Sequence, residues 1–197
     1  MTRTAVCTVG STSFQPLVDA ILSPDVLADL PSLGVSTVLV QVGNGTLPSG
    51  WRLGDQTSEQ GLHVEIVQFA PDIEDRVGRA DLVVSHAGAG SILSFLRPLP
   101  LSIPLSPSRS GSPPVQPRRQ LVLVPNSTLM DSHQLDLADE MRKKGWAVVC
   151  EQPDKLAGAL EQLATEARVE HDLPAPSYPP LQQDKVQRIL DDVLGFD

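Results

Sequence analysis

The sequence contains few cysteines, few aromatic residues and few positive charges, and each shortage excludes a class of protein. Two cysteines, Cys7 and Cys150, cannot form a disulfide framework, and because both lie in apolar, strand-like runs we expect buried, reduced thiols. Aromatic residues make up 4% of the 197 residues, too few for the stacking platforms that bind single-stranded nucleic acid. The 15 Lys and Arg against 24 Asp and Glu give a formal net charge of −9, which disfavours nucleic acid and direct binding to anionic lipid.

Long apolar runs are missing as well. No stretch approaches the roughly 20 apolar residues that span a bilayer. The start, MTRTAVCTVGSTSF, lacks the apolar segment of a secretory signal peptide. We therefore expect a chain that is cytosolic or faces the cytosol, without a membrane span of its own.

Several catalytic motifs are absent, which narrows the chemistry. The chain has neither the GxxxxGK[ST] loop of nucleoside triphosphatases nor the GxSxG elbow of serine hydrolases. Residues 88–93 read GAGSIL with no acidic residue about 20 positions later, so the dinucleotide fingerprint is incomplete. No DxD triplet occurs, which disfavours metal-dependent sugar transfer, and the histidines lack zinc-ligand spacing. We expect no metal and no cofactor.

Hydrophobic residues make up 41% of the chain, and their spacing alternates between strand and helix patterns. Strands are expected at 4–9, 35–42, 62–69, 81–85, 120–124 and 146–150. Helices are expected at 14–22, 24–30, 71–79, 91–96, 132–144, 153–167 and 182–194, and residues 46–61 are expected to form a loop. This alternation predicts an α/β domain with a Rossmann-like, mostly parallel sheet and helices on both faces.

Two proline-rich stretches divide the chain. Residues 98–117 are rich in proline and serine and contain no acid, which is typical of a disordered insertion at a domain surface. Residues 171–180 read as a stiff linker. We therefore expect one domain over 1–170 and a separate amphipathic helix over 181–197. The apolar stripe of that helix consists of Val186, Ile189, Leu190, Val193 and Leu194.

Three loops of small and polar residues follow predicted strands. They are GSTS at 10–13, SHAGAGS at 85–91 and PNSTLMDSHQ at 125–134. Right-handed crossovers place all of them at one edge of a parallel sheet. Each alone is typical of a tight turn, but together, before helix N-termini, they offer backbone N–H groups to an anionic ligand. The sequence predicts that this acidic chain binds a phosphate-bearing ligand without a basic patch.

Four segments resemble the catalytic subunit of the eukaryotic UDP-N-acetylglucosamine transferase of dolichol-linked oligosaccharide synthesis: TVGSTSFQPLVDAIL, ADLVVSHAGAGSIL, LVPNSTLMDSHQLDLADEMRKKGW and YPPLQQDKVQRILDDVLG. This family is similar to the C-terminal, donor-binding half of two-domain GT-B glycosyltransferases, including the bacterial peptidoglycan transferase. The resemblance implies that domain 1–170 binds the donor. It also implies that a separate membrane-anchored subunit supplies the acceptor-binding half, with helix 181–197 as the docking element.

The resemblance implies roles for individual residues. The first loop would face the diphosphate, the second would line the uridine and phosphate region, and the third would contact the sugar or phosphate. His86 is a hydrogen-bonding, electrostatic or general-base candidate. Asp131 and Gln134 also have the spacing of a helix capping box. Where relatives usually have an acid that holds the ribose hydroxyls, this chain has Ser94, and where they often have a basic residue it has Asn44. The implied donor-binding residues are Gly10, Ser11, Thr12, Gly88, Ala89, Gly90, Ser91, Ser94, Asn126, Met130, Asp131, His133 and Gln134.

The function implied is inverting transfer of N-acetylglucosamine from UDP-N-acetylglucosamine to N-acetylglucosaminyl-diphosphodolichol, with a β1,4 bond, at the cytosolic face of the endoplasmic reticulum. The sequence leaves open which subunit supplies the general base. A non-catalytic nucleotide-sugar-binding or scaffold subunit remains the alternative. A UDP-sugar epimerase of the same superfamily would need both halves in one chain, for which 197 residues are too few.

Overall fold

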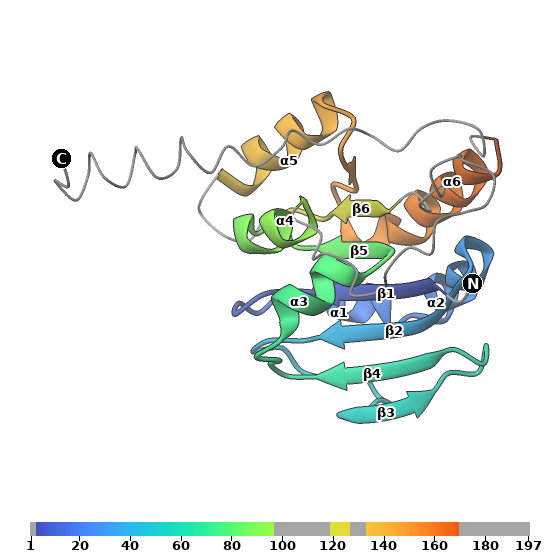
Figure 1. Ribbon diagram of the computed structural model, residues 1–197. Helices are drawn as coiled ribbons and strands as arrows, with labels where there is room; N and C mark the ends of the chain where they lie inside the picture. Colours follow the sequence, from blue (N-terminus) through green and yellow to red (C-terminus); the bar gives the residue numbers. More distant parts are fainter. Residues whose placement is uncertain (1–2, 97–118, 127–132, 170–197) are drawn as a thin grey trace, which may run out of the picture.

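A computed structural model describes residues 3–96, 119–126 and 133–169 (Figure 1). The proline-rich insertion 98–117, the linker 171–180 and the C-terminal helix with its five stripe residues lie outside the described residues. Predictions about those segments therefore stay predictions.

The described residues form a seven-stranded sheet with the order β3-β4-β2-β1-β5-β6-β7. Every neighbouring pair is parallel except β3 with β4. The strands are β1 (Arg3–Thr8), β2 (Val35–Gln41), β3 (Gly54–Thr57), β4 (His63–Val67), β5 (Leu82–Ser85), β6 (Gln120–Leu123) and β7 (Val148–Val149). The helices are α1 (Gln15–Ile21), α2 (Pro24–Asp29), α3 (Ile73–Arg79), α4 (Ala89–Leu96), α5 (His133–Lys143) and α6 (Leu156–Val169), with short 3-10 helices at Leu30–Leu33 and Pro153–Lys155.

Different helices cover the two faces of the sheet (Figure 1). Successive strand residues point to opposite faces, so Cys7 and Val6 of β1 enter different core clusters. Cys7 packs in the cluster built with α1, α2 and α6. Val6 packs in the cluster built with α3, α4 and α5. The predicted α/β class, with a mostly parallel sheet and helices on both faces, is confirmed.

One strand contradicts the sequence prediction. Residues 46–61 were expected to form a loop, yet β3 lies within them and pairs antiparallel with β4. The strand has the sequence GDQT and is largely exposed. Because none of its four residues is a large apolar one, it lacks the alternating pattern from which a strand can be predicted. It is held by its ladder to β4 and by a contact of 3.1 Å between Asp55 and His63 across the pair.

Both cysteines are buried and unpaired, as predicted. Burial raises the pKa of the Cys7 thiol to about 12. Burial also raises the pKa of Cys150, whose Sγ donates a hydrogen bond of 3.0 Å to the Gln152 carbonyl. Because the thiolate is the reactive form, neither thiol is poised for nucleophilic chemistry near neutral pH.

The strand order contains a topological switch at β1. From β1 the chain builds outward through β2 and β4, and it then returns to place β5 on the opposite side of β1. Thr8 pairs with Ser85 at the carboxyl ends of these two strands. The loops that follow them therefore diverge and leave a crevice, which is where open α/β sheets bind ligands.

Candidate functional site

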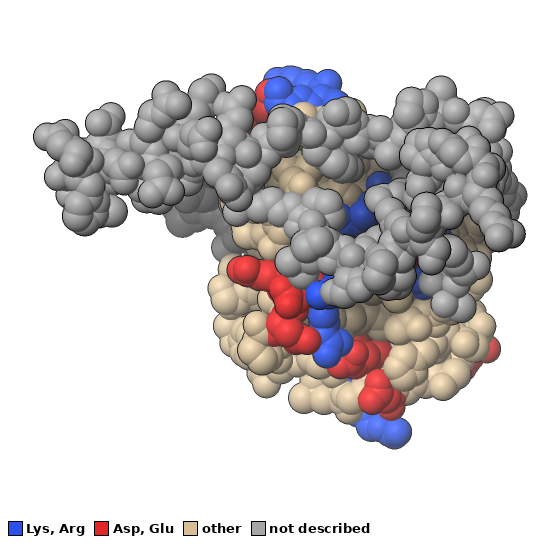
Figure 2. Space-filling view, in the orientation of Figure 1, with Lys and Arg blue, Asp and Glu red and all other residues tan. Residues whose placement is uncertain are grey.

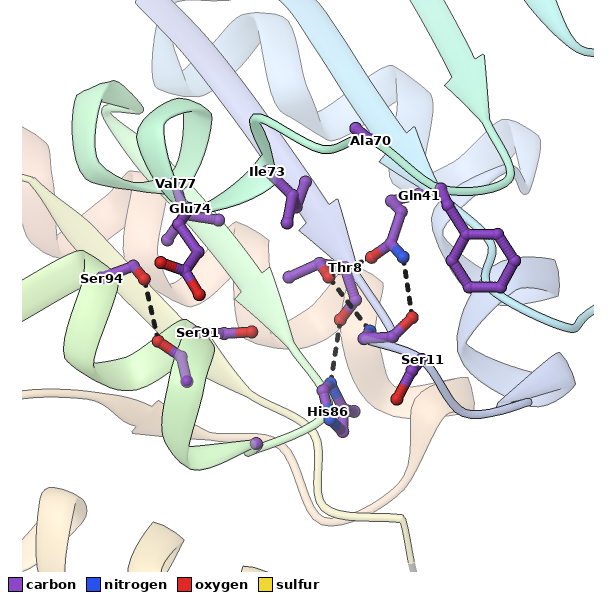
Figure 3. A pocket seen from close by; sticks show the side chains of 14 residues that line it. Thr8, Ser11, Gln41, Ala70, Ile73, Glu74, Val77, His86, Ser91 and Ser94 are labelled. Atoms are coloured by element: carbon purple, nitrogen blue, oxygen red, sulfur yellow. Dashed lines mark hydrogen bonds between the residues drawn. The ribbon is translucent and has the colours of Figure 1, made fainter.

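A pocket of about 410 Å³ lies at this switch point (Figure 3). Its walls come from the loop after β1, the end of β2, helix α3 with the turn before it, and the β5–α4 loop with the first turns of α4. Seven of the predicted site residues line it: Gly10, Ser11, His86, Gly88, Gly90, Ser91 and Ser94. The other lining residues are Thr8, Gln41, Phe69, Ala70, Ile73, Glu74 and Val77. Two of the three loops singled out in the sequence thus meet in one cavity.

A buried hydrogen-bond network holds the Gly10 loop in place. The Gly10 N–H donates to Thr8 Oγ1 at 3.1 Å, and the Thr8 hydroxyl donates to Gln41 Oε1. Gln41 Nε2 in turn donates to the Gly10 carbonyl at 2.7 Å. Since both polar side chains are buried, breaking this ring leaves unsatisfied groups, and the loop is fixed accordingly.

The loop after β2 packs directly on the loop after β1. Gly43 has φ +55°, and a Cβ added there would come within 2.9 Å of the Gly10 carbonyl oxygen. Asn44 Nδ2 donates to the Ser11 carbonyl at 3.0 Å, and the Asn44 N–H donates to the Thr12 carbonyl at 3.2 Å. Asn44 therefore supports the backbone of the pocket wall.

His86 is buried beside Thr8 at the junction of the two loops. Its backbone N–H and its Nδ1 both lie 3.3 Å from the Thr8 carbonyl oxygen. Because a carbonyl oxygen can only accept, this contact places the proton on Nδ1 and leaves a lone pair on Nε2. Burial lowers the pKa of His86 below its ordinary value of 6.5, and the Thr8 hydrogen bond offsets this only in part. His86 is therefore neutral near pH 7.

Glycine is needed at positions 10 and 88 of the pocket for a different structural reason than at position 90. A Cβ on Gly10 would lie 2.7 Å from His86 Cε1, and one on Gly88 would lie 2.6 Å from the same atom. These two glycines make room for the imidazole. A Cβ on Gly90 would meet nothing within 4 Å, so the space beside Gly90 is open toward the pocket. Ala87, which lies between His86 and Gly88, adopts φ 64°, and this turns the chain from β5 into α4.

Other predicted site residues are placed apart from the pocket. Thr12 and Ala89 do not line it, and the Thr12 hydroxyl donates to the Val9 carbonyl at 2.8 Å. Asn126 is buried after β6, and its N–H donates to Gln134 Oε1 at 3.2 Å. The side-chain amide oxygen of Gln134 thus ties α5 to the loop after β6. Met130 and Asp131 lie outside the described residues, as does the side chain of His133, the first residue of α5, so the capping box of Asp131 with Gln134 stays a prediction.

Sequence reasoning missed several lining residues. Gln41 has a detectable signal, since it is a polar residue near the end of the apolar run VSTVLVQV. Glu74 has none, because nothing in the sequence connects a carboxylate on α3 with the glycine-rich loop of α4. The two helices pack against each other, and this brings Glu74 into the cavity.

The pocket is suited to an anion at one end only. Among the described residues that line it there is no lysine or arginine. The N-terminus of α4 supplies backbone N–H groups and a positive dipole end beside Gly88 and Gly90. In the described parts of the chain, no three His, Cys, Asp or Glu side chains lie close enough together to hold a metal ion.

The glycosyltransferase family 28 C-terminal domain matches residues 4–99, the part that contains all fourteen lining residues of the pocket. The UDP-N-acetylglucosamine transferase subunit ALG13 of Cryptococcus neoformans var. neoformans serotype D is 31% identical over 221 residues, covering 98% of both chains. The chain belongs to the ALG13 family. Its relatives in that family are therefore transferase subunits rather than epimerases.

Solved structures agree on the fold. An NMR solution structure of ALG13 superposes with a TM-score of 0.56 at 22% identity, covering 96% of this chain and 94% of that one. Acinetobacter baumannii MurG superposes with a TM-score of 0.51 at 16% identity. This chain is covered completely in that match but spans only half of MurG. The fold of this chain thus corresponds to half of the MurG chain.

Proposed function

We propose that this chain is the donor-binding subunit of an inverting glycosyltransferase. It transfers N-acetylglucosamine from UDP-N-acetylglucosamine to N-acetylglucosaminyl-diphosphodolichol and forms a β1,4 bond. The observation that carries the proposal is the pocket at the β1–β5 switch point, where a fixed glycine loop, a neutral histidine and a helix N-terminus converge. Membership in a family whose named relatives are UDP-N-acetylglucosamine transferase subunits supports it.

The diphosphate occupies the end of the pocket formed by Gly10, Ser11, His86 and Gly88. Backbone N–H groups and the α4 dipole stabilise the negative charge that develops on the departing UDP. The Nε2 lone pair of the neutral His86 accepts a hydrogen bond from a hydroxyl of the bound ligand, or His86 takes up a proton as the diphosphate leaves. The chain's own residues can stabilise the leaving group without a metal.

A membrane-anchored partner supplies the acceptor-binding half. This chain spans only half of MurG, and its named relatives are transferase subunits, which together support a division of the two halves between subunits. No helix in the described part of the chain is both long and apolar enough to cross a membrane. The complex acts at the cytosolic face of the endoplasmic reticulum. The base that deprotonates the acceptor hydroxyl is either His86 or a residue of the partner.

The test is transfer from UDP-N-acetylglucosamine to the dolichol-linked acceptor by the purified chain, with and without partner-bearing membranes. We expect a β1,4-linked product with the membranes only, at the same rate in excess chelator as in magnesium. Transfer by the isolated chain would remove the need for a partner. UDP binding without transfer under any condition would favour the scaffold alternative, and strict magnesium dependence would contradict the proposed neutralisation of the diphosphate.

A further inference from the structure

Glu74 is an exposed residue whose carboxylate helps to line the pocket, and nothing in the described structure neutralises it. It lies in the first turn of α3, and its side chain points toward Ser91 and Ser94 of α4 (Figure 3). Among the described residues it has neither a hydrogen-bond nor an ion-pair partner. Arg76 on the same helix is engaged elsewhere, at 2.6 Å from Glu65 and 2.9 Å from Asp72. The Glu74 carboxylate is therefore available to a ligand.

The groups around Glu74 define what it can bind. The Ser94 hydroxyl donates its hydrogen to the Gly90 carbonyl at 2.9 Å, so toward the pocket it can only accept. Ile73 and Val77 contribute apolar surface. Ser91, in the first turn of α4, adds a hydroxyl that can donate or accept. The negative charge of the Glu74 carboxylate repels phosphate at this end and favours a neutral group that donates hydrogen bonds. A pair of adjacent hydroxyls matches the two oxygens of one carboxylate.

We propose that Glu74 binds the two ribose hydroxyls of the donor nucleotide and is the specificity-determining residue for that ring. This inference rests on the proposed function. In Figure 3 Glu74 lies at the side of the pocket away from Ser11 and Gln41, so a nucleotide with its diphosphate beside Gly10 and His86 extends toward it. Helix α4 contributes the hydroxyls of Ser91 and Ser94 to this end of the pocket, and the negative charge there comes from the Glu74 carboxylate. It approaches the same end of the pocket from the facing helix.

The experiment is calorimetric titration of the full-length chain with UDP and with 2′,3′-dideoxy-UDP. Glu74→Gln keeps the size of the side chain and removes its charge. We expect about tenfold weaker binding of UDP, as for the loss of a charge-assisted hydrogen bond, and unchanged binding of the dideoxy compound. Asp75→Asn is the matched control. It removes an acid from the same helical turn that does not line the pocket, and both affinities should stay at the wild-type value.

A rescue variant separates ligand binding from a purely structural role. In the Glu74→Gln background, Ser94→Glu returns a carboxylate to the same end of the pocket, and we expect the preference for UDP over the dideoxy compound to return. A role confined to the α3 dipole would lower the melting temperature of Glu74→Gln and weaken the binding of both ligands equally, which would overturn the proposal.

Two further outcomes would contradict the proposal. A loss of affinity for UDP-N-acetylglucosamine but not for UDP would assign Glu74 to the sugar and would overturn it. Equal binding of UDP by wild type and Glu74→Gln would overturn this inference alone, whereas no UDP binding by wild type would overturn the proposed function with it.

Discussion

Gly90 offers the sharpest test of where the donor lies, because the protein itself leaves the space beside it open. A Cβ there meets nothing within 4 Å, whereas one on Gly88 would displace the His86 ring. We expect Gly90→Val to lower transfer at least tenfold, about 1.4 kcal/mol, by crowding the phosphate or uridine. Transfer rates and thermal melting of the same preparation measure the two effects separately.

Gly90→Ala is the matched control for folding. Alanine in a helix is more favourable than glycine by roughly 1 kcal/mol, so this variant should melt no earlier than wild type. Gly88→Val should also lose transfer, but its loss would report on His86 rather than on the ligand. Full activity in a folded Gly90→Val variant would place the donor elsewhere.

His86 makes folding stability depend on pH. The unfolded chain takes up a proton at this residue as the pH falls through about 6.5, whereas burial keeps the folded form neutral to lower pH because its pKa is lowered. The contribution to stability is therefore complete above pH 6.5 and declines as the pH falls below that value. Urea titrations between pH 5 and pH 8 should show this decline.

The matched variant for the pH effect is His86→Gln, which cannot titrate. Its free energy of unfolding should depend less on pH over this range, because the two proteins differ only at residue 86. Parallel pH curves for the two proteins would mean that His86 does not differ between the folded and unfolded states.

At the scale of elements, Arg119 fixes the chain where it returns from the insertion. Its guanidinium donates to the carbonyls of Val77, Ala80 and Phe95 at 2.7, 2.8 and 2.9 Å, and it lies 4.3 Å from the centroid of the Phe95 ring. One side chain thus joins the end of α3, the end of α4 and the start of β6. Because Arg119 reaches the carbonyl of Phe95, the two ends of the insertion are close enough for a short connection.

We predict that residues 98–117 can be replaced by about four residues with stability and transfer within a few-fold of wild type, provided that Arg119 is kept. The comparison is the same replacement combined with Arg119→Gln, which leaves carbonyl groups unpaired and should cost roughly 2–3 kcal/mol. Denaturant titration and a transfer assay measure both variants. An inactive or unfolded product with Arg119 intact would show that the insertion packs on the domain or contacts the partner.

Hydrophobic periodicity was enough to predict most elements, because buried strands and amphipathic helices carry their pattern locally. Capping signals are local as well. The pair Ser23-Pro24 predicts the start of α2, and Ser23 Oγ accepts a hydrogen bond from the Val26 N–H at 3.4 Å. The polar strand β3 could not be predicted, because its pairing partner β4 determines its structure. Residues of the glycine loops were identified from their own motifs. Glu74 was not, because only the packing of α3 on α4 brings it to them.

For the whole molecule, the C-terminal helix is predicted to attach the chain to its partner. An apolar stripe in a groove gains affinity from a few anchors, so two charges there should abolish docking. We expect Ile189→Asp combined with Val193→Asp to release the chain from partner-bearing membranes, while thermal melting of the domain is unchanged. Co-sedimentation measures the release. A folded double variant that still sediments with the membranes would put the docking surface elsewhere.

The exposed strand β3 has a consequence for how the chain behaves at high concentration. Without it, β4 would be the edge of the sheet, and Val64 and Ile66 would flank an open row of hydrogen-bonding groups. β3 covers that edge with four residues that carry no large apolar side chain. A polar, charged edge is a poor template for a further strand from another molecule. The same residues that concealed β3 from sequence reasoning thus protect the protein against aggregation through this side of its sheet.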